Sequence, residues 1–209
     1  MSEPIKAGVI GWPVAHSRSP LIHRHWLSRH GIDGRYERIP VRPEELEGFL
    51  ATLADRGLSG CNVTVPLKEQ AHDIVARTNP SGLTDTARRL RAVNTIWLQD
   101  GAIHADNTDA YGFMASFRQH RPDWRAAGRS VLVIGAGGAA RAVVAALLDA
   151  GVKTVTVANR TLAKAETLAR EMGGPVTPLP LSDLPRELSD SDVLVNTTTL
   201  GMTGQPPLD

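Results

Sequence analysis

Short apolar runs alternate with longer amphipathic segments along most of the chain. In the first half, the segments between the runs carry helix start signals such as Ser19-Pro20, where a capping residue is followed by proline in the first turn. Strands that alternate with crossover helices are typical of a mostly parallel α/β sheet. The predicted strands are Lys6–Ile10, Tyr36–Val41 and Gly60–Val65, and the predicted helices are Ser19–His30, Pro43–Arg56 and Leu67–Arg77.

A hairpin is predicted after the third helix. The runs Ala92–Leu98 and Ala102–Ala105 flank Asp100-Gly101, a dipeptide that favours tight turns between antiparallel strands. We therefore expect the two strands to pair antiparallel at an edge of the sheet. A further helix is predicted over Asp109–His120.

The stretch 121–128, which contains proline and glycine, marks the expected boundary between a first domain, residues 1–120, and a second, residues 121–209. The second domain opens on the fully apolar run Ser130–Ile134, of the kind buried in a parallel sheet. Its pattern predicts a Rossmann-type doubly wound fold, and its length holds only about the first half of one. The later predicted elements are a helix to about Ala150, a strand Thr154–Ala158, a helix Leu162–Met172 and a strand Val193–Asn196.

Composition places the chain among ordinary globular proteins, since 42% of its 209 residues are hydrophobic and 22% are charged. Lys plus Arg number 23 and Asp plus Glu 22, so a formal charge of +1 provides no general field for a nucleic acid or an anionic membrane. One cysteine, Cys61, excludes an internal disulfide framework and a cysteine metal cluster. The sequence shows neither a signal peptide nor an apolar run of membrane-spanning length. We therefore expect a cytoplasmic protein with no metal, nucleic-acid or membrane partner.

A glycine-rich turn follows the apolar strand and opens a helix. Its sequence, Gly135-Ala136-Gly137-Gly138-Ala139-Ala140, fits the G-x-G-x-x-A variant of the dinucleotide-binding fingerprint. The match is weak alone, but a strand before it and a helix after it are the context that the fingerprint requires. Gly135 would make the tight turn, and Gly137 would let the backbone approach a pyrophosphate at the helix N-terminus.

The end of the next predicted strand distinguishes NAD from NADP. An NAD site usually has an acidic residue there for the ribose 2′-hydroxyl, whereas a 2′-phosphate needs positive charge and neutral donors. The chain has Asn159-Arg160-Thr161 and then Lys164, so NADP is the predicted cofactor. The alternative is that Arg160 and Lys164 are ordinary solvated residues at a helix entry.

Three polar clusters of the first domain follow predicted strands, where open parallel sheets gather ligand groups. Asn62 and Thr64 alternate with valines, so on a strand both side chains would point to one face, with Lys68 after them at the mouth. Hydroxyls, amides, an ammonium and a carboxylate suit a small, hydroxyl-rich substrate. Helix capping is an alternative role for Ser19, and turn formation is one for the third cluster. The clusters are Ser17-Arg18-Ser19, Asn62-Val63-Thr64 with Lys68, and Asn94 with Asn107-Thr108-Asp109.

Together these motifs resemble those of the shikimate dehydrogenase family, the NADPH-dependent reductases of 3-dehydroshikimate in aromatic amino-acid biosynthesis. The resemblance covers essentially the whole chain, and several motifs in order are far more specific than any one of them. They are Ser17-Arg18-Ser19-Pro20, Asn62-Val63-Thr64-Val65-Pro66-Leu67-Lys68, Ala92-Val93-Asn94-Thr95, Asp106-Asn107-Thr108-Asp109, the Gly135–Ala139 turn, Asn159-Arg160-Thr161 and Gly201-Met202.

The resemblance implies an oxidoreductase of the shikimate pathway, on the route to chorismate, with NADP as cofactor and shikimate or 3-dehydroshikimate as substrate. It implies proton transfer by Lys68 with Asp109 beside it, and a position near the cofactor for Asp85. It also implies that shikimate hydroxyls and carboxylate are bound by Ser17, Ser19, Thr64, Asn94 and Asp109, to which the strand pattern adds Asn62. The predicted NADP site comprises Asp85, Gly135, Ala136, Gly137, Gly138, Ala139, Asn159, Arg160, Thr161 and Lys164. We expect a monomer or a homodimer.

Two features depart from the family pattern. Arg91 stands where the family usually has glycine before the Ala-Val-Asn-Thr motif. The family also continues for several strands and helices beyond its Gly-Met motif, whereas this sequence stops at Asp209. We therefore expect most of the nicotinamide half to be missing, either because the chain is a fragment or because the protein is truncated.

Other functions remain open at this point. A quinate/shikimate dehydrogenase that uses NAD would share the fold, although Arg160 argues against it. A truncated or non-catalytic regulator could bind shikimate or NADP without turnover, but the even charge and the lack of an obvious DNA-reading helix argue against it. Methylene-tetrahydrofolate dehydrogenase and glutamyl-tRNA reductase share the glycine turn, but the Ser17/Ser19 and Lys68/Asp109 pattern does not suit them.

Overall fold

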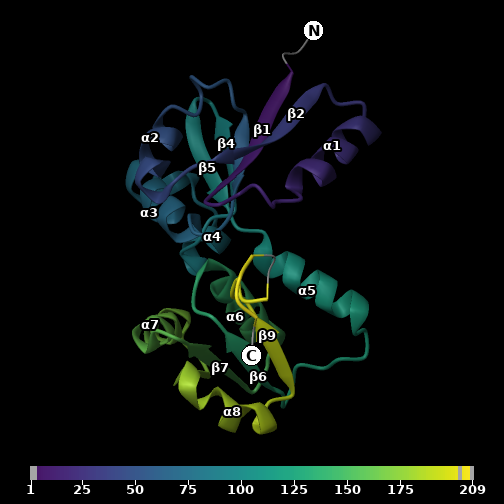
Figure 1. Cartoon of the computed structure of the whole chain (residues 1–209), viewed down its shortest axis with the longest axis vertical. Helices are drawn as coiled ribbons and strands as arrows, with labels where there is room; N and C mark the ends of the chain where they lie inside the picture. Colours follow the sequence, from purple (N-terminus) through teal and green to yellow (C-terminus); the bar gives the residue numbers. More distant parts are fainter. Residues whose placement is uncertain (1–3, 202–203, 208–209) are drawn as a thin grey trace. The chain divides into compact units, whose positions relative to one another are not determined.

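The computed structural model describes residues 4–201 and 204–207 of the chain. They form two compact units, one up to Thr108 and one from Asp109 onward, each with its own β-sheet (Figure 1). The α/β class that the alternating pattern predicts is confirmed. Met202 of the Gly-Met motif lies outside the described residues.

The first unit contains a five-stranded sheet with the strand order β2-β1-β3-β4-β5. β1 pairs in parallel with β2 and β3, whereas β3 with β4 and β4 with β5 are antiparallel. The predicted hairpin is confirmed, because β4 and β5 pair antiparallel and β5 lies at the edge of the sheet. The strands are β1 Ile5–Gly11, β2 Gly34–Pro40, β3 Gly60–Val63, β4 Thr95–Gln99 and β5 Ala102–Asp106.

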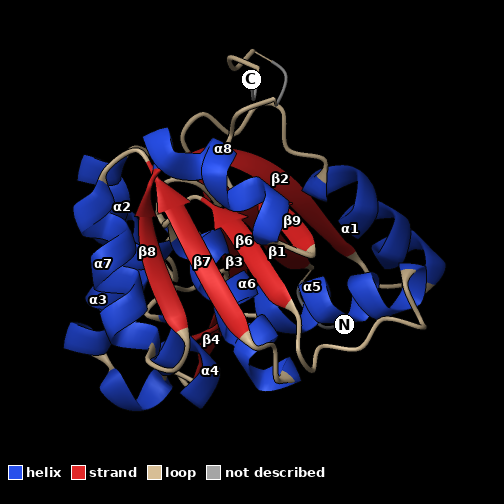
Figure 2. Ribbon diagram, turned by 90° about the horizontal axis from the view of Figure 1, so that it is seen from below, coloured by secondary structure: helices blue, strands red, loops and turns tan. Residues whose placement is uncertain are grey.

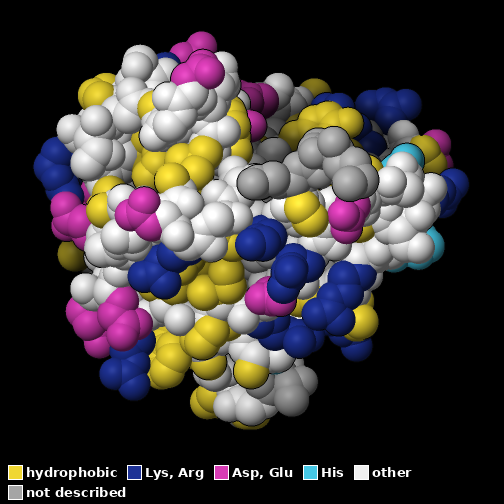
Figure 3. Space-filling model, turned by 90° about the horizontal axis from the view of Figure 1, so that it is seen from above, with side chains coloured by type: hydrophobic (Ala, Val, Ile, Leu, Met, Phe, Trp, Pro, Cys, Tyr) yellow, Lys and Arg dark blue, Asp and Glu magenta, His cyan; other side chains and the backbone are white. Residues whose placement is uncertain are grey.

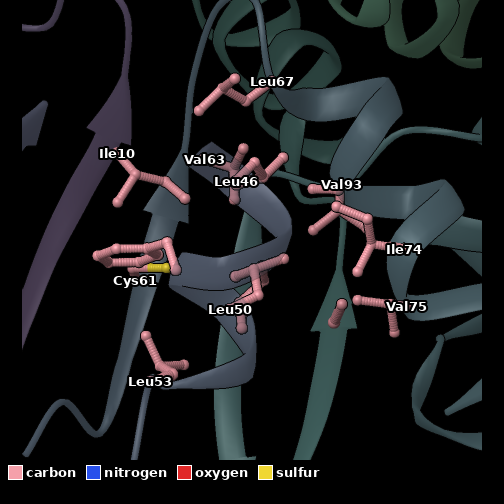
Figure 4. Close-up of a cluster of buried hydrophobic side chains, with 14 of the residues drawn as sticks. Ile10, Leu46, Leu50, Leu53, Cys61, Val63, Leu67, Ile74, Val75 and Val93 are labelled. Atoms are coloured by element: carbon pink, nitrogen blue, oxygen red, sulfur yellow. The ribbon is translucent and has the colours of Figure 1, made fainter. Parts of the chain in front are cut away.

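Helices cover both faces of this sheet. α1 lies on one face, and α2 and α3 lie on the other (Figure 1). Because side chains alternate along a strand, Val9 packs with Tyr36 on the α1 face, whereas Ile10 points into the larger apolar core. Leu46 from α2 and Ile74 from α3 fill that core (Figure 4). The helices are α1 Ser19–Arg29, α2 Leu46–Ala51, α3 Lys68–Thr78 and α4 Asp85–Leu90, and 3-10 turns occupy Pro43–Glu45 and Pro80–Gly82.

Local features of the first unit differ from the prediction. The helix expected over Pro43–Arg56 is a 3-10 turn followed by the short α2. Ser19 was expected to cap α1, but it is the first helical residue, and Arg18 occupies the N-cap position without a side-chain cap bond. The unpredicted helix α4 has only two buried side chains, Ala87 and Leu90, so its sequence carries almost no apolar periodicity.

Helix α4 ends at Arg91 in the left-handed conformation, with φ 49° and ψ 39°. A non-glycine residue there costs about 1–2 kcal/mol because its Cβ approaches the following carbonyl. Glycine would meet the same backbone requirement without this strain. The departure at residue 91 therefore keeps the turn into the Asn94 segment and strains it.

The second unit contains a four-stranded, all-parallel sheet with the order β8-β7-β6-β9 (Figure 2). In chain order the strands run third, second, first and fourth, which is the start of the doubly wound dinucleotide-binding order. The predicted Rossmann-type fold is thus confirmed, with β8 and α8 as elements that the sequence pattern missed. The elements are α5 Asp109–His120, β6 Ser130–Ile134, α6 Gly138–Ala150, β7 Thr154–Asn159, α7 Leu162–Met172, β8 Val176–Pro180, α8 Leu184–Glu187 and β9 Val193–Asn196, with 3-10 turns at Leu181–Asp183 and Leu188–Asp190.

Helix α5 packs within the second unit. The sequence grouped it with the first domain, but it contacts α6, and Phe113 packs against the apolar core of the second sheet. Phe117 lies edge-on to Trp124, with ring centroids 4.8 Å apart. The two compact units therefore divide between Thr108 and Asp109 rather than near residue 120.

A buried ion pair joins α6 to α7. Nη2 of Arg141 donates to Oε2 of Glu171 at 2.6 Å, and the two side chains are 9% and 18% exposed. Removing charges from water is costly unless they are paired, so each side chain depends on the other. The pair fixes α7 against the helix that follows the glycine turn.

Charged side chains of both signs are interspersed on the face shown in Figure 3. Among the residues that the structure describes, no helix is long and apolar enough to cross a membrane. Within the same residues, no cluster of three His, Cys, Asp or Glu side chains is arranged to hold a metal ion.

Candidate functional site

The turn after β1 carries Ser17 and Ser19 at the start of α1. Ser17 Oγ donates to Ser19 Oγ at 3.2 Å, and the Ser19 amide donates to Ser17 Oγ at 3.3 Å. Nε of Arg38 supports this turn by donating to the Ser17 carbonyl at 2.8 Å. Ser19 does not cap α1, and its hydroxyl oxygen accepts from Ser17 Oγ. The two hydroxyls together can bind a carboxylate or a hydroxyl group.

Asn62 lies on β3, within a hydrogen-bond network of the protein itself. Its Oδ1 accepts from the Tyr36 hydroxyl at 2.6 Å. Its Nδ2 donates to the Asn94 carbonyl and to Thr95 Oγ1, both at 3.2 Å. Protein groups therefore occupy both ends of the amide that the sequence assigned to the substrate.

Thr64 lies in the turn after β3, because the strand ends at Val63. The strand alternation that placed Asn62 and Thr64 on one face therefore does not extend to Thr64. Its amide donates to the Ile10 carbonyl at 2.9 Å. A Cβ on Gly11 would lie 2.5 Å from Thr64 Cγ2, so glycine permits this close approach. Thr64 thus lies against the carboxyl end of β1.

Asn94 and Thr108 bond each other in both directions. Asn94 Nδ2 donates to Thr108 Oγ1 at 3.0 Å, and the Thr108 amide donates to Asn94 Oδ1 at 3.0 Å. Thr95 Oγ1 also donates to Asn94 Oδ1 at 2.9 Å, and Asn94 is only 9% exposed. These bonds fix the backbone immediately before Asp109, the first residue of α5.

Lys68 is the first residue of α3 and is partly buried. Its carbonyl accepts from the Val93 amide at 2.9 Å, and the Val63 amide donates to the Asn94 carbonyl at 2.8 Å. These backbone bonds hold the start of α3 beside the segment that carries Asn94. The structure therefore brings Lys68, Asn94 and Thr64 to one end of the first sheet.

Two other predicted residues belong to different places in the chain. Asp109 opens the second unit, whereas Lys68 belongs to the first. Asp85 is the first residue of α4, and its fully exposed side chain lies 3.6 Å from that of Arg88. Asp85 in the cofactor site and Asp109 beside Lys68 stay predictions.

Polar residues to which the sequence assigned no role complete these networks. Tyr36 is 3% exposed, and its burial raises the pKa of the hydroxyl. Asp106 accepts from the Thr84 hydroxyl and from the Asn107 amide, so it anchors the turn before Thr108. A buried tyrosine usually finds a hydrogen-bond partner, and this was the available signal, but the sequence does not indicate which partner.

The glycine turn of the second unit lies at the carboxyl end of β6, between β7 and β9. The strand order reverses there, and open α/β sheets bind ligands at that point. Gly135 has φ +107°, and a Cβ on it would lie 2.6 Å from Thr197 Oγ1. Gly137 is the N-cap of α6, whose first amides have no helical partner. Gly135, Ala136, Gly137, Gly138 and Ala139 therefore suit a phosphate group.

Replacing Gly135 with alanine is expected to raise the Kd for NADP at least 10-fold. The methyl group would meet Thr197, and strain of the backbone at this φ costs about 1–3 kcal/mol. Titration calorimetry with NADP measures the effect. Gly151→Ala is the matched control, because Gly151 also has a positive φ, 83°, but nothing lies within 4 Å of its Cβ position. Equal Kd values for Gly135→Ala and the parent chain would contradict the assignment.

The end of β7 lies next to the glycine turn, because the Gly135 amide donates to the Ala158 carbonyl at 2.8 Å. Asn159 Nδ2 donates to the Thr161 carbonyl at 2.8 Å and shapes the following turn. Arg160 and Lys164 are exposed. Two cations and no carboxylate at this strand end favour a phosphate over a ribose hydroxyl.

Cys61, on β3, faces the core of the first unit. Burial raises the pKa of its thiol to about 12. A thiol that stays protonated at neutral pH is a poor nucleophile. Cys61 therefore belongs to the packed core of the first unit.

Two family models match the chain. The model described as the shikimate dehydrogenase substrate binding domain matches residues 9–96, and the one described as shikimate / quinate 5-dehydrogenase matches residues 118–201. The shikimate dehydrogenase (NADP(+)) of Rhodospirillum rubrum is 53% identical over 208 residues, which cover 97% of this chain and 72% of that protein. The protein of the same name from Paramagnetospirillum magneticum is 51% identical over 204 residues, with the same coverage of 97% and 72%.

Solved structures resemble the chain over nearly all of its length. Shikimate dehydrogenase from Aquifex aeolicus has a TM-score of 0.84 at 33% identity, covering 99% of this chain and 73% of that one. Shikimate 5-dehydrogenase from Thermus thermophilus, in complex with NADP(H) and shikimate, has a TM-score of 0.78 at 36% identity, covering 95% of this chain and 70% of that one. The chain thus spans less than three quarters of each relative.

Proposed function

Because the chain belongs to the shikimate dehydrogenase family, we propose that it catalyses the reversible NADP-dependent reduction of 3-dehydroshikimate to shikimate in aromatic amino-acid biosynthesis. The observation that carries this function is the gathering of Thr64, Lys68 and Asn94 at one end of the first sheet. A small polyhydroxylated carboxylate is recognised by such hydroxyl, amide and ammonium groups. The glycine turn beside Arg160 supplies the matching nucleotide site.

The substrate roles follow from the hydrogen-bonding capacity of each group. Ser17 and Ser19 present two adjacent hydroxyl groups, which suits the shikimate carboxylate. Thr64, Asn94 and Asp109 offer a hydroxyl, an amide and a carboxylate for the ring hydroxyls. Asn94 is well prepared for this role, because Thr108 holds its amide in one orientation.

Lys68 is the proposed proton donor. The chemistry supplied by NADPH, when bound, is transfer of a hydride to the C3 carbonyl carbon of the substrate. Negative charge then develops on the C3 oxygen, and a donor placed there lowers the barrier. Lys68 as an ammonium gives its proton to this oxygen, with Asp109 as its proposed carboxylate partner. In the oxidative direction, the neutral amine of Lys68 accepts the proton of the C3 hydroxyl.

A spectrophotometric assay with shikimate and NADP tests this function directly. We expect NADPH to form in the presence of both compounds and not with either alone. Quinate with NAD is the comparison that would identify a quinate/shikimate dehydrogenase. Saturable shikimate binding without NADPH formation would instead support a non-catalytic regulator.

Replacing Arg160 with alanine is expected to lower kcat/KM for NADP by about 10- to 100-fold, because a charge-assisted hydrogen bond to the 2′-phosphate is lost. The value for NAD, which has no such phosphate, should change less than about 2-fold, since no contact is removed. Steady-state rates with each cofactor give the ratio. Arg170→Ala is the matched control, as Arg170 is an exposed arginine on α7. Equal losses for NADP and NAD would remove Arg160 from phosphate recognition.

The proposed setting is that of a biosynthetic enzyme in the cytoplasm, acting as a monomer or homodimer without nucleic acid. The nearly balanced charges, with a formal net charge of +1, support the absence of a nucleic-acid partner. Sedimentation analysis would establish the oligomeric state.

A further inference from the structure

A continuous line of side-chain hydrogen bonds crosses the first sheet and contains Tyr36. The Tyr36 hydroxyl donates to Asn62 Oδ1 at 2.6 Å. From Asn62 the line continues through Thr95 and Asn94, each within 3.2 Å of the next. In order, its members are Tyr36, Asn62, Thr95, Asn94 and Thr108. Tyr36 begins this line on β2, and the line ends beside Asn94 and Thr108.

Tyr36 reaches this place from a distant strand. It stands on β2, opposite Ala7 of β1, while Asn62 stands on β3 beyond β1. Neighbouring strands are about 4.8 Å apart, so the ring must cross one whole strand to bring its hydroxyl to Asn62. The small Ala7 side chain leaves room for this crossing.

The ring of Tyr36 stacks on a histidine of α1. His23 of α1 stacks on it with a centroid distance of 3.9 Å and an angle of 4° between the rings. Burial lowers the pKa of His23, so the stacking partner is the neutral imidazole at neutral pH. With its ring clamped in this way, the hydroxyl has a defined position.

The bond directions show what that hydroxyl controls. Asn62 Oδ1 faces the hydroxyl donor, and Nδ2 faces the Asn94 carbonyl and Thr95. A flipped amide would set its oxygen against the Asn94 carbonyl, two acceptors with no proton between them. Because Nδ2 donates to Thr95 Oγ1, the Thr95 proton is directed to Asn94 Oδ1.

We propose that Tyr36 is a positioning residue for shikimate recognition, which orients the Asn62–Thr95–Asn94 line through its hydroxyl. The inference rests on the proposed function, since it assigns shikimate to the groups that the line orients. A phenylalanine could fill the slot between His23 and the sheet equally well. The hydroxyl therefore has a purpose beyond packing, because a buried hydroxyl is retained at a cost unless its bonds are needed.

Tyr36→Phe tests this role by removing one oxygen and keeping the ring. We expect the Kd and the KM for shikimate to rise about 10-fold, the effect of losing a buried hydrogen bond, with kcat within about 3-fold of the parent. The Kd for NADP should not change. Tyr111→Phe is the matched control, because it also removes a tyrosine hydroxyl, but from a side chain that is 81% exposed.

A double-mutant cycle separates positioning from simple loss of stability. If Tyr36 acts through Asn62, then Tyr36→Phe should raise the shikimate Kd less than about 2-fold when Asn62 is already alanine. If the effects of Tyr36→Phe and Asn62→Ala on the shikimate Kd multiply, as independent effects do, the proposal is overturned. An unchanged Kd in Tyr36→Phe, for example because water replaces the hydroxyl, would also overturn it. A parent chain that does not bind shikimate would contradict the proposed function, whereas a parent that binds beside an unaffected Tyr36→Phe would contradict only the positioning role.

Discussion

The Lys68→Ala enzyme is expected to oxidise shikimate with a kcat about 10²- to 10⁴-fold below the parent, at nearly the same KM. In this direction the neutral amine of Lys68 accepts the proton of the C3 hydroxyl as the hydride leaves, and this proton transfer stabilises the transition state but not the ground state. Removing it therefore raises the barrier to reaction more than it weakens substrate binding. Initial rates at varied shikimate and saturating NADP give both constants.

Lys153→Ala serves as the control for Lys68→Ala. Lys153 is an exposed lysine outside both proposed sites, so its removal changes the net charge equally and should leave kcat unchanged. A large rise in KM at preserved kcat would make Lys68 a binding residue instead. That result would assign proton transfer to another group at the same end of the first sheet.

The Arg141→Ala chain is expected to lose about 3–5 kcal/mol of the free energy of unfolding of the second unit, because Glu171 would remain as a buried carboxylate without its cation. The 18% exposure of Glu171 places the loss toward the lower end of that range. Urea denaturation followed by circular dichroism measures it. NADP binding should weaken in parallel only as far as the unit unfolds.

Replacing both partners, as Arg141→Met with Glu171→Leu, provides the matched comparison. Two apolar side chains of similar size leave no unpaired charge, so most of the lost stability should return. A loss below about 1 kcal/mol in Arg141→Ala would show that water already reaches the pair and that it behaves as a surface ion pair.

The sequence predicts the second unit well because its elements are local and strongly patterned. Ser130–Ile134 is buried on both faces of the sheet, so its apolar run is unbroken and the prediction matches the strand. Leu162–Met172 and Asp109–His120 likewise agree with their predicted bounds. The strand Val176–Pro180 was missed because two prolines interrupt its pattern at the sheet edge.

Longer-range features were beyond the sequence pattern. Helix Asp109–His120 was predicted, but its packing on the second unit depends on contacts of Phe113 and Phe117 that periodicity does not assign. The capping role expected for Ser19 was wrong, because the helix begins at Ser19 itself and Arg18 occupies the N-cap position.

The candidate site shows the same division. Motifs predicted Lys68, Asn94 and the glycine turn as site residues. In the structure Lys68 follows the end of β3, the glycine turn follows β6, and Asn94 lies directly before β4, beside the end of β3. The role of Tyr36 could not be found in this way. Its partner, Asn62, is 26 residues away and one strand further across the sheet, and only the folded chain shows that the ring reaches it.

The buried thiol of Cys61 makes this chain convenient for site-specific labelling. Its buried, protonated thiol should not react with maleimides under native conditions, and the sequence contains no other cysteine. A cysteine introduced on the surface of each unit would then accept a fluorophore or a spin label without background. Energy transfer or dipolar spectroscopy on such a pair would report how far apart the two units are in solution, with and without shikimate and NADP.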